Sequence, residues 1–306
     1  MFTRRVVWAV FISLVLCANA DARLLILVSS ESPLYRSFEQ GLKTGLATGK
    51  EQQKIIFKLA DTFEATKELS SYSMIIAAGV DAAKRLVGHD IGDIKVIYTM
   101  LPLNSYEWLH ENNQLVKNHQ VLYIDQPPYR FINLVKTALP GVKSLGYVYG
   151  DVSLAHVDKL EQAAKSQQLS FNAVALQPER NLAATLDTVV SQNDALLVLP
   201  DPYLFNRRAV QALLLASLRQ RKPLIAYSDS YVNAGALLAL FSSPEQIGRY
   251  TAELVNCFEA DCKDIAARQH HPKYFSVSVN KVVARQLGIT IPSAKEIEAQ
   301  LEAMEP

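Results

Sequence analysis

Polar and small residues stand where the short apolar runs of this 306-residue sequence end. In the first half of the chain these positions hold the polar or small residues Ser29, Ser30, Gly79 and Thr99, with Val80 directly after Gly79. In the second half they hold carboxylates and tyrosines, namely Asp151, Asp201, Tyr203, Asp229 and Tyr231. If the runs are parallel strands, these positions meet at one edge of a sheet, where the N–H groups of the following helices are free to bind a ligand. The pattern predicts a binding site for a small zwitterion.

In such a site, the carboxylate of the ligand would lie on helix N-termini of the first half. Its ammonium would be held by Asp229, Asp201 or Asp151, and Tyr203 or Tyr231 could stack on an apolar or aromatic body. Asp and Ser directly before a helix are also ordinary N-caps, so each residue taken alone has a structural alternative. Three acidic positions in one half favour ligand contact over three separate caps.

The sequence carries none of the common catalytic or cofactor motifs at a strand-to-helix junction. H-E-x-x-H, G-x-S-x-G, the P-loop and G-x-G-x-x-G are all missing, so we predict no catalytic residue and no cofactor. His270 and His271 are the only neighbouring histidines, and no Cys or carboxylate lies near them at metal-ligand spacing. We expect this pair in an exposed loop and predict no metal site.

Short apolar runs alternate with amphipathic segments from Arg23 onward, which is typical of an α/β protein. Several runs are apolar at successive positions, so helices should cover both faces of parallel sheets. The paired prolines Pro127 and Pro128 stop a strand and mark the clearest division into two lobes. The expected strands are 24–29, 54–59, 74–78, 95–99, 121–124, 145–149, 171–175, 195–199, 224–227, 237–241 and 275–279.

Residues 1–22 have the pattern of a secretory signal peptide. Arg4 and Arg5 precede an apolar run that ends at Leu16, and small residues around Ala20 offer cleavage sites. A retained N-terminal anchor is an alternative, although the run is shorter than the ~20 apolar residues that span a membrane. Lipidation at Cys17 is a second alternative, which the large Leu16 before it disfavours. The expected location is the periplasm.

The net charge and the cysteine count bear on the possible partners of the protein and on a disulfide bond. The chain has 31 Lys and Arg against 30 Asp and Glu, so nothing favours nucleic-acid binding. Removing residues 1–22 takes away two arginines and one aspartate, which leaves 29 of each sign, and it leaves two cysteines, Cys257 and Cys262. An even pair in an exported chain predicts a disulfide. The bridge requires a helix that ends before Cys262, because five helical residues rise about 7.5 Å and bridged Cα atoms lie within about 7 Å.

Three stretches of the second half resemble a known family. They are residues 223–237, 242–249 and 275–288, which read PLIAYSDSYVNAGAL, SSPEQIGR and FSVSVNKVVARQLG. They look like the C-terminal half of the ABC-transporter substrate-binding family that includes tryptophan- and tyrosine-binding lipoproteins. The similarity extends over essentially the whole chain after the leader and is looser in the first half.

The resemblance implies a type I periplasmic-binding-protein fold, with two Rossmann-like lobes that close on a ligand in the cleft between them. The lobes would have parallel sheets and a three-crossover hinge. Carried onto this chain, the crossovers fall near 123–126, 241–243 and 271–274. Lobe 1 would then comprise 23–124 plus 242–270, lobe 2 would comprise 125–241 plus 271–290, and 291–306 would form a C-terminal helix.

Two positions depart from the family's pattern. Met100 and Leu101 follow Thr99 where relatives often carry a polar residue, and Val80 follows Gly79 where they tend to carry threonine. Both changes remove polar groups from strand ends. They predict either a ligand more apolar than the backbone ends of an amino acid or a specificity that differs from the family's.

The implied function is an exported solute-binding protein of an ABC-type uptake system. It would act as a monomer, bind a small molecule such as an amino acid and deliver it to an ABC permease, without catalysing a reaction. One alternative is a periplasmic ligand sensor that signals to a membrane receptor or histidine kinase. Another is an exported enzyme with Asp201 and Asp229 as acid and base.

Overall fold

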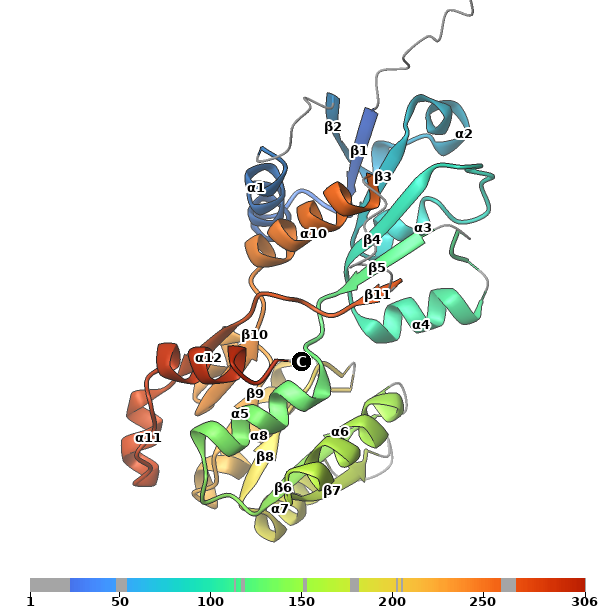
Figure 1. Ribbon diagram of the computed structural model, residues 1–306. Coiled ribbons are helices and arrows are strands. Elements are labelled where there is room, and N and C mark those ends of the chain that lie inside the picture. Colours follow the sequence, from blue (N-terminus) through green and yellow to red (C-terminus); the bar gives the residue numbers. More distant parts are fainter. Residues whose placement is uncertain are drawn as a thin grey trace, which may run out of the picture.

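The protein consists of two lobes, each built on a six-stranded sheet, as the computed structural model shows (Figure 1). The structure describes residues 23–47, 54–112, 114–116, 119–150, 153–176, 182–201, 203–204, 206–259 and 268–305. Among these residues, none of the helices has the length and apolar character needed to cross a bilayer.

The sheet of the first lobe has the strand order β11-β5-β4-β3-β1-β2, and all of its strand pairs are parallel. Its strands are β1 (Arg23–Val28), β2 (Lys54–Leu59), β3 (Met74–Ala78), β4 (Lys95–Leu101), β5 (His119–Tyr123) and β11 (Gln269–His270). Its helices are α1 (Pro33–Leu46), α2 (Ala65–Glu68), α3 (Val80–Lys84), α4 (Leu103–Glu111) and α10 (Pro244–Glu259), with short 3₁₀ turns at Ala60–Thr62 and Leu69–Ser71.

The central strands of this sheet are apolar throughout because both of their faces are covered. Leu25 and Leu27 of β1 belong to one core cluster, and Leu24, Ile26 and Val28 belong to another on the opposite face. Alternate side chains of a strand point to opposite faces, so an uninterrupted apolar run is what a doubly covered strand requires.

Helices α1 and α10 cover one face of the first sheet and lie against each other (Figure 1). Their contact depends on glycines. A Cβ atom at Gly41 would lie 2.0 Å from the carbonyl oxygen of Glu245, and one at Gly248 would lie 2.1 Å from the carbonyl oxygen of Phe38. The two backbones therefore meet at a distance that no larger residue permits at either position.

The sheet of the second lobe has the order β12-β10-β9-β8-β6-β7. Its strands are β6 (Ser144–Tyr149), β7 (Ser170–Ala175), β8 (Ala195–Leu197), β9 (Leu224–Ala226), β10 (Leu238–Phe241) and β12 (Ser276–Val279). Its helices are α5 (Pro128–Ala138), α6 (Leu154–Ser166), α7 (Leu182–Gln192), α8 (Arg207–Arg219), α9 (Asp229–Ala234), α11 (Lys281–Leu287) and α12 (Ala294–Glu302). Helix α12 packs against α5 and β12, with Ile297 and Leu301 in the core of this lobe.

The chain passes between the lobes three times, from β5 to α5, from β10 to α10 and from β11 to β12 (Figure 1). The predicted α/β fold of two Rossmann-like lobes with a three-crossover hinge is therefore confirmed. One edge differs from the expected parallel sheets, because β12 pairs with β10 in the antiparallel direction. The chain enters β12 directly from the hinge, without the helix that a parallel connection needs.

The prediction of an exposed loop at His270 and His271 is wrong. His270 lies in β11, which extends the first sheet beside β5, and only 7% of its surface is exposed. The Nδ1 atom of His271 lies 2.9 Å from the carbonyl oxygen of Asp125. A two-residue strand is too short to show the alternation from which strands are recognised in a sequence.

Candidate ligand site between the lobes

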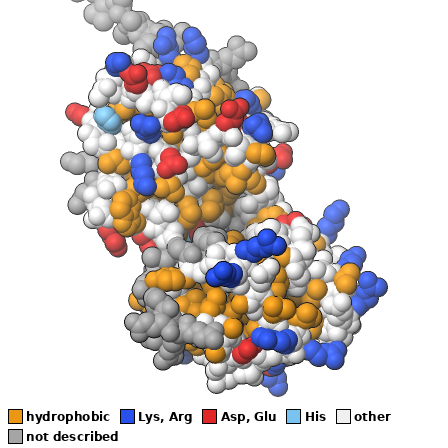
Figure 2. Space-filling view, turned by 180° about the vertical axis from the view of Figure 1, so that it is seen from behind, with side chains coloured by type: hydrophobic (Ala, Val, Ile, Leu, Met, Phe, Trp, Pro, Cys, Tyr) orange, Lys and Arg blue, Asp and Glu red, His pale blue; other side chains and the backbone are white. Residues whose placement is uncertain are grey.

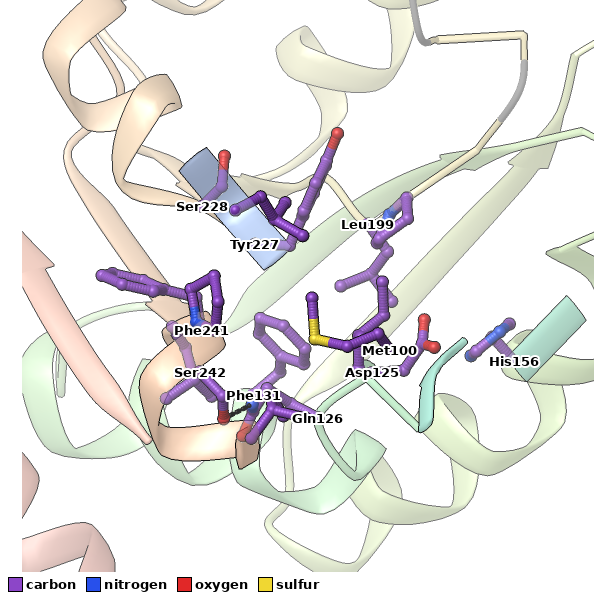
Figure 3. Close-up of a pocket in the computed structure, with 16 residues that line it drawn as sticks. Met100, Asp125, Gln126, Phe131, His156, Leu199, Tyr227, Ser228, Phe241 and Ser242 are labelled. Carbon is purple, nitrogen blue, oxygen red and sulfur yellow. Dashed lines mark hydrogen bonds between the residues drawn. The ribbon is translucent and has the colours of Figure 1, made fainter. Parts of the chain in front are cut away.

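A cavity of about 320 Å³ lies between the two lobes and is lined by residues of both. The first lobe contributes Leu34 and Met100, and α10 contributes Pro244 and Ile247. The second lobe contributes Phe131, Leu199, Leu240 and Phe241, together with Tyr227 and Ser228 at the end of β9. Most of these side chains are apolar, and Figure 3 shows Met100, Phe131, Leu199 and Tyr227 arranged around a common space.

Met100 reaches the cavity because β4 is irregular at its end. The pairing of β4 with β5 shifts register between Tyr98 and Leu101. Met100 lies inside this shift with a φ of 52°, in the left-handed region that a residue with a Cβ atom adopts at some cost. The turned backbone lets a residue at the end of the strand contribute to the wall of the cavity.

Two titratable groups lie on one side of the cavity, Asp125 from the first crossover and His156 from α6 (Figure 3). Burial raises the pKa of Asp125 to about 6, although the carboxylate accepts a hydrogen bond of 2.7 Å from the N–H of Leu103. Burial also lowers the pKa of His156 to about 4. At neutral pH the cavity therefore holds an uncharged imidazole and a carboxylate that is mainly ionised, and this carboxylate could accept a hydrogen bond from an ammonium or hydroxyl group.

A hydrogen-bond network below the cavity joins the three crossovers. Gln126 of the first crossover donates to the hydroxyl of Ser242 in the second, at 2.7 Å, and that hydroxyl donates to the carbonyl of Tyr274 in the third. Arg130 donates to the side chain of Gln126 and to the carbonyl of Pro272. The hinge is thus cross-linked by side chains directly beside the ligand space, since Gln126 and Ser242 also line the cavity.

Arg130 is the buried centre of this network, with only 3% of its surface exposed. Its guanidinium binds both carboxylate oxygens of Glu305, at 2.7 and 2.6 Å, and lies 4.4 Å from the centre of the Phe275 ring. A planar guanidinium suits this site because it satisfies a bidentate carboxylate, a carbonyl, an amide oxygen and an aromatic face at once.

The hydroxyl groups of Ser29 and Thr99, which were predicted to bind the ligand, form hydrogen bonds within the protein. The hydroxyl of Ser29 donates to the carbonyl of Ala78 at 3.1 Å and accepts from the N–H of Ala82 at 3.0 Å. Gly79 has a φ of 94°, and a Cβ atom there would meet the Tyr35 hydroxyl at 2.0 Å. Thr99 is fully buried, with its hydroxyl 3.2 Å from that of Thr251 on α10. Ser30 is exposed and Val80 is half-buried.

The predicted carboxylates of the second lobe are also engaged by the protein. Asp201 is 1% exposed and accepts hydrogen bonds from the N–H of Gly150 at 2.7 Å, the hydroxyl of Ser153 at 2.6 Å and the N–H of Tyr203 at 2.8 Å. Asp229 is exposed and accepts from the side chains of Asn233, at 2.8 Å, and Ser278. Asp151 lies outside the described residues.

Neither of the two predicted tyrosines is among the residues that line the cavity. Tyr231 is buried, and the centre of its ring lies 5.2 Å from that of Tyr227, which does line the cavity. Tyr203 is 41% exposed. The cavity wall therefore comes from neighbours of the predicted positions, and ligand contact by the predicted residues stays a prediction. The sequence drew attention to Met100, because this position departs from the family's pattern. Nothing in the sequence singled out Asp125 or His156 as cavity residues.

The predicted disulfide lies only partly within the described residues. Helix α10 ends at Glu259, before Cys262, as a bridge requires. Cys257 near its end is mostly buried, but Cys262 lies outside the described residues, so the bridge stays a prediction. Within the part of the chain that the structure describes, no group of three or more His, Cys, Asp or Glu side chains could hold a metal ion.

Two lobes joined by three crossovers, with a cavity at the hinge lined from both sides, define the class of two-lobed solute-binding proteins. The model of the ABC transporter substrate binding protein family matches residues 39–301, and the chain belongs to this family. The resemblance seen in the sequence is thereby confirmed. The family implies a small-molecule ligand and an ABC permease as partner. No curated protein matches the chain.

Solved structures agree on the fold. A ligand-free, open substrate-binding protein with adhesive properties from Clostridium difficile is 18% identical, with a TM-score of 0.68, over 89% of this chain and 96% of the other. An ABC domain from Streptococcus pneumoniae in complex with L-Trp is 20% identical, with a TM-score of 0.57, over 91% and 98%. A conserved domain protein from Vibrio cholerae is 21% identical, with a TM-score of 0.56, over the same shares.

Proposed function

We propose that this protein is the exported solute-binding component of an ABC-type uptake system. We further propose that it binds a small molecule whose apolar part is about the size of an aromatic ring. The observation that carries the proposal is the cavity at the hinge, whose walls combine Met100, Phe131, Leu199, Tyr227 and Phe241 from both lobes. A ligand in this space would touch both lobes at once and so favour their closure. The cavity's apolar walls would contribute most of the binding free energy.

Within this proposal an aromatic amino acid is the first candidate ligand. Its ring would fill the apolar space, and its ammonium could pair with Asp125, the carboxylate of the cavity. The L-Trp complex of the related fold supports testing this class first. An apolar metabolite that lacks a carboxylate is the second candidate, because no Lys or Arg is among the residues that line the cavity.

A thermal-shift screen of the mature protein tests the proposal. The panel should contain aromatic and branched amino acids, their decarboxylated amines and uncharged aromatic metabolites. A ligand present at about 100 times its dissociation constant should add ~2.7 kcal/mol to the free energy of unfolding, which raises the melting temperature by several degrees. Amines that bind as well as amino acids would indicate that only the ammonium is recognised.

Two neighbouring serines give a matched pair of variants. Ser228 lines the cavity, whereas Ser230 on the same helix end is exposed and does not. Ser228→Trp should fill the cavity and abolish the ligand-induced shift, and Ser230→Trp should leave the shift intact. A shift that survives Ser228→Trp would place the ligand elsewhere and contradict the proposal.

A further inference from the structure

The outer surface of the second lobe combines exposed apolar side chains with an excess of positive charge. Leu215 and Leu218 of α8 are 53% and 61% exposed, and Val282 of α11 is 54% exposed. The two helices are neighbours, because the guanidinium of Arg221 after α8 donates to the carbonyl of Gln286 on α11 at 3.0 Å. We call this surface the α8–α11 face.

The positive charge of this face follows from the sequence. No Asp or Glu occurs in residues 202–228, although this stretch holds five Arg and Lys residues, and none occurs in residues 265–295. Arg219 and Lys222 have carboxylate partners in Asp187 and Asp194. No ion pair found among the described residues includes Arg207, Arg208, Lys281 or Arg285. Figure 2 shows the second lobe, below, with Lys and Arg side chains around hydrophobic ones and few Asp or Glu.

A shallow groove beside α11 also combines apolar and positively charged side chains. It measures about 630 Å³, and Val279, Ile289 and Ile291 form part of its apolar lining. Lys281 and Arg285 line it as well. Such a groove offers an apolar surface and two cations to one amphiphilic anion.

We propose that the α8–α11 face docks on the surface of a membrane that contains anionic phospholipids. Long cationic side chains around a small pair of exposed leucines suit a headgroup layer, in which the cations pair with lipid phosphates and the leucines enter the acyl boundary. A tight protein interface would instead require a large, contiguous and well-packed apolar centre. Here Leu215 and Leu218 form one small pair on α8, and Val282 lies on α11. Because the whole chain is nearly neutral, this local excess would orient the molecule with its second lobe towards a negative surface.

Flotation of the ligand-free mature protein with lipid vesicles tests this proposal independently of any solute. We expect partitioning onto vesicles of phosphatidylcholine with phosphatidylglycerol, and none onto phosphatidylcholine alone. Raising the salt from about 0.05 M to about 0.5 M should weaken binding strongly, since the Debye length falls to a few ångströms. Arg207→Glu combined with Arg208→Glu should reduce the partition coefficient at least ~10-fold. Glutamates are favourable in the first turn of a helix, so this variant should stay folded.

Two further variants separate the contributions. Leu215→Ser combined with Leu218→Ser should weaken binding at low and high salt alike, because the apolar contribution is not screened. Lys54→Glu combined with Lys84→Glu reverses two exposed charges on the first lobe and should leave binding unchanged. The proposal is overturned if anionic vesicles fail to bind the protein at low salt, if neutral vesicles bind it equally, or if the first-lobe variant loses as much binding as the α8 variant.

Discussion

Asp125 and His156 give the ligand space its polar character, and their protonation responds to burial in opposite ways. Burial disfavours the charged form of each group, so it raises the pKa of the acid to about 6 and lowers the pKa of the base to about 4. Both groups are thus uncharged between about pH 4 and pH 6. Above pH 6 the carboxylate ionises and gives the cavity a single negative charge.

The two shifts should make opposite contributions to the pH dependence of stability. Asp125 has a pKa of about 3.9 in the unfolded chain, so the stability that it contributes below that value is lost as the pH rises through about 6. His156 has an unfolded pKa of about 6.5, so its contribution is present above that value and is lost as the pH falls through about 4. In the wild type these two slopes largely cancel.

Asp125→Asn should therefore lose about 2 kcal/mol more stability than the wild type between pH 7 and pH 4, and His156→Gln should show the reverse trend. Urea unfolding at a series of pH values measures both. The other histidines are present in the wild type and in both variants. The test therefore compares the pH dependence of the unfolding free energy of each variant with that of the wild type. Identical pH profiles in the three proteins would refute this assignment.

The residue scale is also where the sequence was least informative. Hydroxyls and carboxylates at strand ends were expected to bind a ligand, but Ser29 caps backbone groups around α3 and Asp201 braces the loop that follows β8. Capping and ligand binding require the same residue types at the same positions, so composition does not separate them. The difference depends on which side chains the surrounding loops engage, and this becomes visible only in three dimensions.

At the scale of elements, prediction was more successful because burial imposes a pattern. Every strand with an uninterrupted apolar run was predicted within a few residues. Helix α12 lies within the predicted C-terminal helix 291–306. The strand β11 was missed because it is set by pairing with β5 rather than by its own sequence. Its place in the first sheet is what brings the third crossover beside the other two.

The crossovers are held by Arg130, and Glu305 supplies the counter-charge. Glu305→Gln should lower the free energy of unfolding by about 2 kcal/mol, because the buried guanidinium would lose its only ionised partner in the network. Glu302→Gln, on the exposed side of α12, serves as the control and should change it by less than about 0.5 kcal/mol. Urea unfolding measures both variants, and equal effects would show that the pair does not stabilise the hinge.

The whole molecule is divided into two lobes with separate hydrophobic cores. In the part of the chain that the structure describes, three short crossovers connect the two lobes. Several large apolar side chains are exposed, including Leu34, which lines the cavity from the first lobe. Closure on a ligand would bury such apolar surface, and the free energy gained would offset the entropy lost when the hinge becomes ordered.

Ligand binding should therefore make the molecule more compact. Small-angle X-ray scattering of the mature protein should give a smaller radius of gyration when the ligand found in the thermal-shift screen is added. Ser228→Trp should show no such change under the same conditions. An unchanged radius with a ligand that demonstrably binds would mean that the cavity is occupied without closure.

The glycine contact between α1 and α10 has a consequence for the order in which the protein folds. Helix α10 begins at Pro244, after most of the second lobe, yet it covers α1 near the start of the chain. During synthesis, residues 23–124 emerge long before the helix that completes their packing. Until then the side of α1 that holds Gly41 and Gly45 lacks the helix against which it packs. The first lobe is therefore the first to be made and the last to be finished, and a chain truncated before Pro244 would lack the means to complete it.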